Sequence, residues 1–92
     1  MSVATILKHP IQPGGVTRIN GHVGARPISA GPDTNGTPSV WFETHGDNGG
    51  SCDIEILTLP TGREFDPHGW MFIDTYSTPD GVWHTYWKTV HR

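Results

Sequence analysis

The chain has 92 residues, a formal net charge of −3 and a single cysteine. This length excludes a second hydrophobic core, and the lone cysteine excludes an intramolecular disulfide. The six lysines and arginines are scattered, which argues against a nucleic-acid-binding face, and no apolar run reaches the roughly 18 residues of a membrane span.

We therefore expect one soluble domain over residues 1–92. Residues 1–13 contain one lysine and no apolar core of the kind found in signal peptides. A lone cysteine is also more typical of a reducing compartment than of a secreted protein. Both observations predict a cytoplasmic location.

Glycine and proline set the fold class. The chain has 12 glycines and 8 prolines, and the longest stretch free of both is residues 82–92. Because an interior glycine costs a helix about 1 kcal/mol and a proline about 3 kcal/mol, helices are strongly disfavoured. The intervening stretches have the length of strands and are rich in β-branched and aromatic residues. The sequence predicts an all-β fold with little or no helix.

Seven strands are predicted, at residues 4–9, 16–20, 26–30, 39–45, 52–59, 70–76 and 82–90. Turn-forming residues separate them at positions 13–15, 33–36, 46–50 and 78–81. Pro79 and the pair Asp80-Gly81 predict a tight hairpin, and the connection 60–69 is the one loop long enough to carry function. These elements predict a small antiparallel β-sandwich or a rolled sheet, and periodicity leaves both open.

Side-chain alternation assigns faces within the strands. Ile54 and Ile56 point one way while Asp53 and Glu55 point the other, so the strand is expected to be half solvated at its start. Similarly, Val40 and Phe42 lie opposite Trp41.

Both faces of the last strand are apolar. Trp83 and Trp87 share one face, and Val82, Tyr86 and Val90 share the other. We expect this strand to be central or covered on both sides.

Histidine is abundant, and a metal site has to be considered. His45, Asp47, Cys52, His68 and His84 carry zinc-binding atoms, but no two of them have the spacing of a metal-binding motif. We interpret them as ordinary strand and turn residues and predict neither a metal nor a cofactor.

A nucleophilic site is the remaining catalytic possibility. Cys52 and His45 flank one connection, so a hairpin there would bring thiol and imidazole together. Asp47 and Asp53 add negative charge, which disfavours a reactive thiolate. We expect a buried, inert cysteine and no catalytic residue.

The aromatic excess indicates a binding surface. A core this small cannot easily enclose four tryptophans, each with about 200 Å² to bury. Two are expected in the core, and one or two at an interface or cleft. The binding candidates are Trp41, Trp70, Trp83, Trp87 and Tyr86, together with Arg26, Arg63 and His68.

Several segments resemble a family of short phage proteins, chiefly from phages of actinobacteria. They are residues 6–11, Gly24-Ala25-Arg26, residues 39–43 around Trp41, residues 72–75 and the closing Val82-Trp83-His84. His9 stands where that family has an aromatic ring. The resemblance extends over nearly the whole chain.

The resemblance implies a non-enzymatic protein that binds a host protein in the host cytoplasm and inhibits or redirects it. Two alternatives remain: a sponge for a host defence nucleotide, with Arg26 or Arg63 pairing with phosphates, and a minor structural protein of the virion. A homodimer is also expected, because self-association would bury spare tryptophans.

Overall fold

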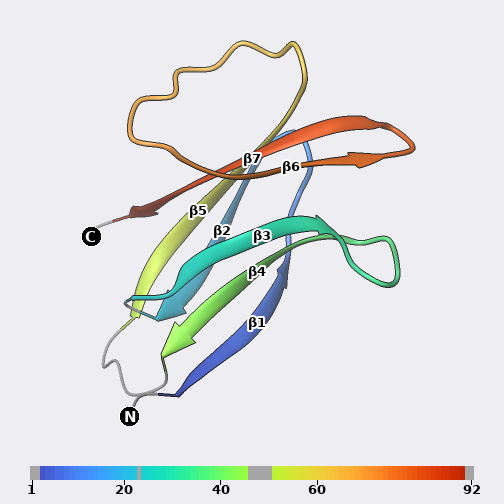
Figure 1. Ribbon diagram of the computed structural model, residues 1–92. Coiled ribbons are helices and arrows are strands. Elements are labelled where there is room, and N and C mark those ends of the chain that lie inside the picture. The colour runs from blue at the N-terminus through green and yellow to red at the C-terminus, as the bar shows by residue number, and fades with distance from the viewer. Residues whose placement is uncertain (1–2, 23, 46–50, 91–92) are drawn as a thin grey trace.

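The computed structural model describes residues 3–22, 24–45 and 51–90, which form seven strands in two antiparallel sheets (Figure 1). The strands are β1 (Ala4–Pro10), β2 (Val16–His22), β3 (Arg26–Pro32), β4 (Pro38–His45), β5 (Ser51–Pro60), β6 (Met71–Thr78) and β7 (Gly81–Val90). One sheet has the order β1-β4-β3 and the other β2-β5-β7-β6. The predicted all-β fold class is confirmed, and the architecture is a sandwich. Among these residues no helix has the length and apolar character needed to cross a membrane.

Local turn chemistry builds the two tight hairpins. Thr78 pairs with Gly81 across the predicted β6–β7 turn. In the β3–β4 turn the Asp33 carboxylate accepts hydrogen bonds from the backbone N–H groups of Asn35 (2.8 Å) and Thr37 (2.9 Å). Gly36 supplies the positive φ of 81° that this turn needs. The predicted turn at 46–50 lies outside the described residues.

Inner-face side chains of both sheets make one core. Its buried members are Ile11, Ile19, Ala25, Ala30, Val40, Phe42, Ile54 and Ile56. The predicted opposition of Ile54 and Ile56 to Asp53 and Glu55 is confirmed. The expected solvated start of that strand is wrong, since Asp53 is only 5% exposed. The β5 strand lies between β2 and β7, and the Asp53 carboxylate lies 3.9 Å from the Arg18 guanidinium of β2.

The last strand is central, as predicted. β7 lies between β5 and β6. Trp83 and Trp87 are on its inner face, opposite Tyr76 and Met71 of β6. The β6 strand begins one residue later than predicted, because the backbone N–H of Trp70 donates to the carbonyl of Pro67 (3.0 Å) within the loop.

The two long sides of the sandwich differ. On one side β3 packs against β6, and the backbone N–H of Ala30 donates to the Asp74 carboxylate (3.1 Å), which joins the sheets. Gly31 lies beside Tyr76, and a Cβ on it would meet Cβ of Tyr76 at the ordinary contact distance of 3.7 Å. On the other side are the edge strands β1 and β2. We call the first the closed side and the second the open side.

Candidate binding surfaces

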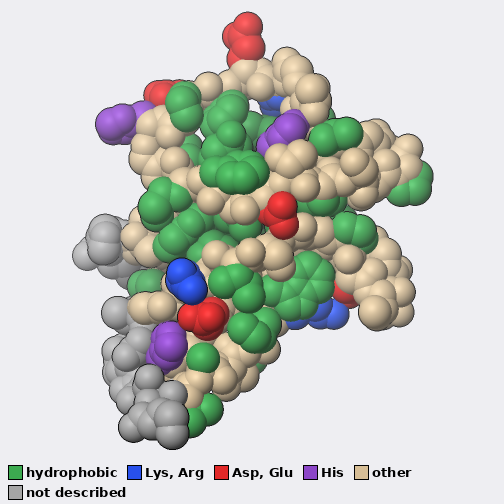
Figure 2. All heavy atoms as spheres, viewed as in Figure 1, with side chains coloured by type: hydrophobic (Ala, Val, Ile, Leu, Met, Phe, Trp, Pro, Cys, Tyr) green, Lys and Arg blue, Asp and Glu red, His purple; other side chains and the backbone are tan. Residues whose placement is uncertain are grey.

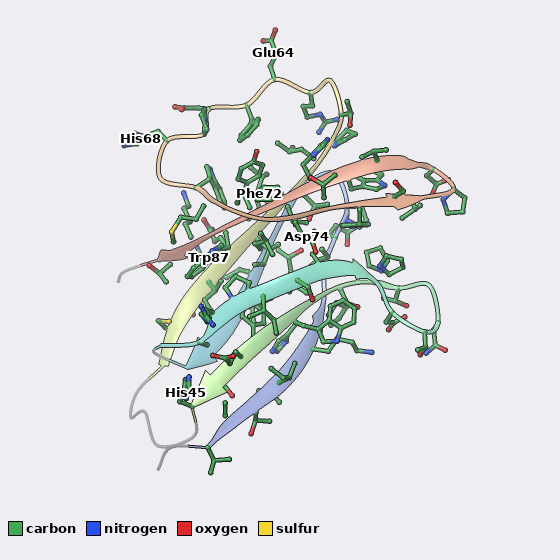
Figure 3. The ribbon with its side chains drawn as sticks, viewed as in Figure 1. His45, Glu64, His68, Phe72, Asp74 and Trp87 are labelled. Carbon is green, nitrogen blue, oxygen red and sulfur yellow. The ribbon has the colours of Figure 1, made fainter. Side chains whose placement is uncertain are left out.

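An apolar row crosses the outer face of the four-stranded sheet. Val16, Leu57, Tyr86 and Phe72 are direct cross-strand neighbours on β2, β5, β7 and β6. Phe72 is 58% exposed and Val16 is 50% exposed. Figure 2 shows hydrophobic side chains gathered beneath the 61–70 loop, and Figure 3 places Phe72 there. Large apolar side chains this exposed and this close together are unusual for a small soluble domain.

The loop adds a third ring to this row. Phe65 packs on Tyr86 with ring centroids 5.0 Å apart, and Phe72 contacts the same tyrosine edge-on at 5.6 Å. Tyr86 is half-buried between them, while Phe65 stays exposed. From here on, the apolar row means Val16, Leu57, Phe65, Phe72 and Tyr86.

Specific contacts hold the loop over the sheet. The Arg63 guanidinium donates to the carbonyl of Gly14 (3.4 Å), which ties the loop to the segment before β2. Within the loop, the backbone N–H of His68 donates to the Asp66 carboxylate (3.0 Å). Trp70 packs against β7, with the Lys88 ammonium 4.4 Å from the centroid of its ring. Phe65 is therefore held in place from both ends of the loop.

Polar groups flank the apolar row. On one side Glu55 accepts a hydrogen bond from Arg18 (2.9 Å) and pairs with Lys88 (3.7 Å). On the other side the His84 ring is hydrogen-bonded to the hydroxyls of Thr61 (2.7 Å) and Thr75 (3.0 Å). An apolar centre with a satisfied polar rim is the usual composition of a protein-binding site.

The outer face of the three-stranded sheet is more mixed. Trp41 is half-buried there, and Ile6, which pairs with Glu43, is exposed. Ile28 is also exposed, at the register shift between Pro27 and Ser29 of β3. Arg26 lies on the same face, 3.5 Å from the Glu43 carboxylate. The apolar area is broken by these charges.

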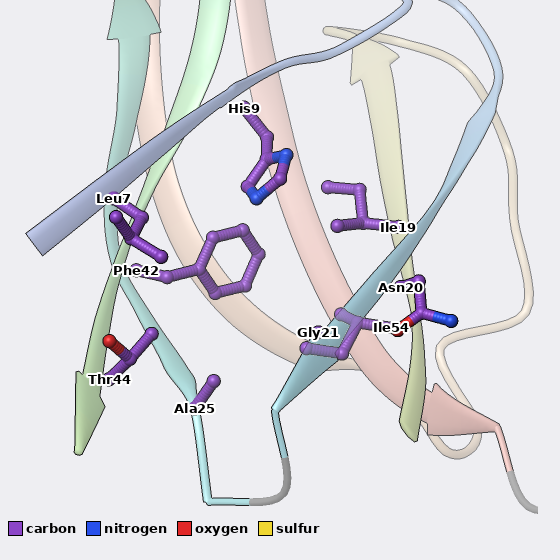
Figure 4. Close-up of a pocket in the computed structure, with 9 residues that line it drawn as sticks. All are labelled: Leu7, His9, Ile19, Asn20, Gly21, Ala25, Phe42, Thr44 and Ile54. Carbon is purple, nitrogen blue, oxygen red and sulfur yellow. The ribbon is translucent and has the colours of Figure 1, made fainter. Parts of the chain in front are cut away.

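A cleft of about 240 Å³ opens between the sheets on the open side (Figure 4). Leu7 and His9 of β1, Phe42 of β4, Ile19 of β2 and Ile54 of β5 are among its lining residues. The His9 ring meets Phe42 edge-on, with centroids 5.7 Å apart. β1 and β2 thus form the two lips of an apolar cleft.

The chain matches one known protein family. A family model described as a domain of unknown function, DUF7352, matches residues 2–92. The chain belongs to this family. No curated protein and no solved structure matches the chain significantly.

In this DUF7352 domain the tryptophans divide into two pairs. Trp87 packs against the core, and the indole N–H of Trp83 donates to the Thr78 hydroxyl (3.1 Å). Both lie on the inner face. Trp41 and Trp70 are the outward-facing pair: Trp41 is on β4 of the three-stranded sheet, and Trp70 is at the end of the loop over the four-stranded sheet.

The other candidates are dispersed over the domain. Arg26 is on the outer face of the three-stranded sheet, whereas Arg63 and the exposed His68 are on the loop over the other sheet. In Figure 3 the His68 side chain points away from the rest of the domain. Tyr86 is the one candidate at the centre of the apolar row.

The structure does not bring Cys52 and His45 together as a hairpin would. β4 and β5 belong to different sheets, so the hypothesis of a thiol and imidazole paired across a hairpin is wrong. Cys52 packs against the core, and His45 points outward, 3.5 Å from the Glu43 carboxylate. Asp47 lies outside the described residues. Within the described part of the chain, no three His, Cys, Asp or Glu side chains are grouped to hold a metal ion.

Sequence reasoning missed Val16, Leu57, Phe65 and Phe72. Alternation alone does not place Phe72 with Tyr86, because a bulge between Phe72 and Asp74 shifts the β6 register. Phe65 reaches the row only through the folded loop. An aromatic residue in a long, otherwise polar connection is the signal that could have drawn attention to it.

Proposed function

We propose that this domain is a phage-encoded, non-enzymatic protein that binds a host cytoplasmic protein and inhibits or redirects it. The observation that carries the proposal is the apolar row, in which Phe72 and Val16 stay exposed on either side of Tyr86. The phage origin rests on the sequence resemblance, which includes the closing Val82-Trp83-His84.

The row suits a protein partner. Because neighbouring strands are about 4.8 Å apart, a row across four strands is about 15 Å long. That length matches about three turns of helix, whose pitch is about 5.4 Å. An apolar helix face laid on the row would cover the exposed rings of Phe65 and Phe72 and leave the polar rims around Glu55 and His84 in water.

The geometry favours this partner over a nucleotide. A nucleotide site would need an aromatic ring and an arginine in one concavity. In the cleft described above, Phe42 and His9 supply rings, but no arginine is among the described residues that line it. Arg26 is on the outer face of the three-stranded sheet, and Arg63 is on the loop over the other sheet.

Site-specific photo-crosslinking tests the proposal. A photoreactive phenylalanine analogue at position 72, in chain produced inside the host, is expected to capture one host protein. The same analogue at position 28, on the other sheet, is the matched control and should not capture it. Phe65→Ser should weaken the capture at least tenfold, whereas Ile28→Ser should not.

Equal capture from positions 72 and 28, or none from either, would contradict the proposal. Capture of a virion protein alone would replace the host target with a structural role.

A further inference from the structure

Within residues 3–22, 24–45 and 51–90, no strand lies beside the outer edge of β1, which presents unpaired backbone groups. The backbone N–H of Ile11 donates to the carbonyl of Pro38 (2.9 Å), and the β1–β4 register continues without a shift from there to Ala4. In an antiparallel ladder the hydrogen-bonded residues alternate, so odd-numbered residues of β1 bond to β4. The N–H and C=O groups of Ala4, Ile6 and Lys8 therefore point away from the sheet.

This edge lacks the usual protection. Natural sheets commonly shield an edge with lysine or proline. Here the Lys8 ammonium is held 2.8 Å from Asp33 Oδ2, over the outer face of its own sheet. Leu7 faces inward and is still 40% exposed, whereas Ala30 on the closed side is buried. Only Pro10, at the end of the strand, lacks an N–H to offer.

We infer that β1 pairs with β1 of a second copy of this chain, antiparallel, with the two-fold axis at Leu7. This register uses every residue of β1, because Ala4–Pro10 is symmetric about Leu7. Ile6 then exchanges both backbone hydrogen bonds with the second copy's Lys8. The result is a six-stranded sheet that runs through both copies.

Side-chain chemistry favours this self-pairing. Lys8 lies opposite an isoleucine rather than another lysine, so no like charges face each other directly. The two Leu7 side chains meet at a non-hydrogen-bonded position, where side chains approach most closely. They lie at the mouth of the cleft between β1 and β2, and the added strand covers the exposed Leu7. A free peptide would satisfy the same backbone groups, and the experiments below separate the two.

The first test compares Lys8→Pro with Lys8→Ala by analytical ultracentrifugation over a range of concentrations. Both variants lose the contact with Asp33, but only proline removes the outward N–H. Proline is tolerated on an edge whose N–H faces solvent, and circular dichroism verifies the fold. Wild type and Lys8→Ala are expected to be dimers, with Lys8→Pro dissociating at least tenfold more readily. A monomeric wild type at millimolar concentration, or a dimer indifferent to Lys8→Pro, would overturn the inference.

The second test fixes the register. In a Cys52→Ser background, Leu7→Cys is expected to form an intermolecular disulfide, because cross-strand neighbours at this position have a suitable Cβ separation. Ile6→Cys is the control, since its counterpart in the second copy is displaced along the strand. Faster crosslinking by Ile6→Cys, or equal crosslinking by both, would overturn the two-fold axis at Leu7.

This inference is independent of the proposed function. With the photoreactive analogue at position 72, Phe65→Ser is expected to weaken capture of the host protein at least tenfold and leave the dimer intact, and Lys8→Pro is expected to do the reverse.

Discussion

The closed and open sides start from the same situation, two edge strands facing each other across a sandwich, and resolve it differently. On the closed side the Asp74 carboxylate accepts a hydrogen bond from the edge N–H of Ala30, and β3 packs against β6. On the open side β1 keeps outward backbone groups, and a cleft remains beside Leu7. In this sandwich the two sheets are joined at the edge where a side-chain acceptor meets an outward N–H. Where such an acceptor is missing, the edge remains available to another strand.

The largest effect is expected from breaking the closed side. Asp74→Ala leaves the Ala30 N–H without its acceptor, and we expect the free energy of unfolding to fall by about 2 kcal/mol, because hydrogen bonds to charged groups are worth about 1.5–3 kcal/mol. Asp74→Asn keeps an acceptor and should cost less. Urea denaturation measures both, with Asp80→Ala in the exposed hairpin as control. A loss for Asp74→Ala no greater than for Asp80→Ala would show that this bond does not hold the sheets together.

The second prediction concerns a buried hydroxyl group on the closed side. The Tyr76 hydroxyl is buried and finds no hydrogen-bond partner among the described residues. Tyr76→Phe is therefore expected to raise the free energy of unfolding by about 1 kcal/mol, since an unsatisfied buried polar group costs about 1–3 kcal/mol. A measured loss of stability would mean that the hydroxyl is satisfied in solution.

The same tyrosine predicts an alkaline effect. Burial raises the pKa of Tyr76 above its ordinary value of 10.0. The unfolded chain therefore ionises first, and stability present below pH 10.0 is lost as pH rises through the folded-state pKa. In Tyr76→Phe this part of the alkaline loss should disappear from thermal melts recorded above pH 10.

A smaller effect tests whether the open side has room. A Cβ on Gly21 would lie 3.0 Å from Cδ1 of Ile54, which also lines the cleft. That methyl group can move into the cleft, so the alanine side chain fits. Gly21→Ala is therefore expected to stabilise the domain by about 0.5 kcal/mol, because alanine lowers the conformational entropy of the unfolded chain. Cys52 pairs with Gly21 in register, so Cys52→Ala is a useful neighbouring control in the same thermal melts. Destabilisation by Gly21→Ala would show that the cleft is too small to accept the methyl group.

The smallest effect concerns the contact that holds Lys8. The hydrogen bond from Lys8, together with the Thr37 N–H, lowers the pKa of Asp33 below its ordinary value of 3.8. The stability that this lowered pKa contributes is present above pH 3.8 and is lost as pH falls through the folded-state pKa. Asp33→Asn should thus be less stable than wild type at pH 6, and the difference in free energy of unfolding, measured by urea titration, should become smaller below pH 3.8. A difference that is the same at both pH values would show that ionisation of Asp33 does not contribute to stability.

Local chemistry made part of this structure predictable. The 78–81 hairpin follows from Pro79 and Asp80-Gly81, and the shared faces of Trp83 and Trp87 follow from alternation. Alternation does not say which face is buried, nor that β1 pairs with β4. The bond between Ala30 and Asp74 joins residues far apart in the chain, and no local pattern predicts it. The sequence predicts Tyr86 as a binding residue, but the positions of its neighbours Phe65 and Phe72 depend on a folded loop and a bulge.

The strand order has a consequence for synthesis. Of the seven strands, β1 is made first, yet its partner β4 ends only at His45. At about 5–20 residues per second, the ribosome takes about 2–7 s to add that segment. During this time β1 has neither edge occupied, while the β3–β4 and β6–β7 hairpins can each form as soon as they are made. Neighbouring ribosomes on one message would hold several such strands close together, so the edge that accepts a second copy is also the segment best placed for assembly during translation.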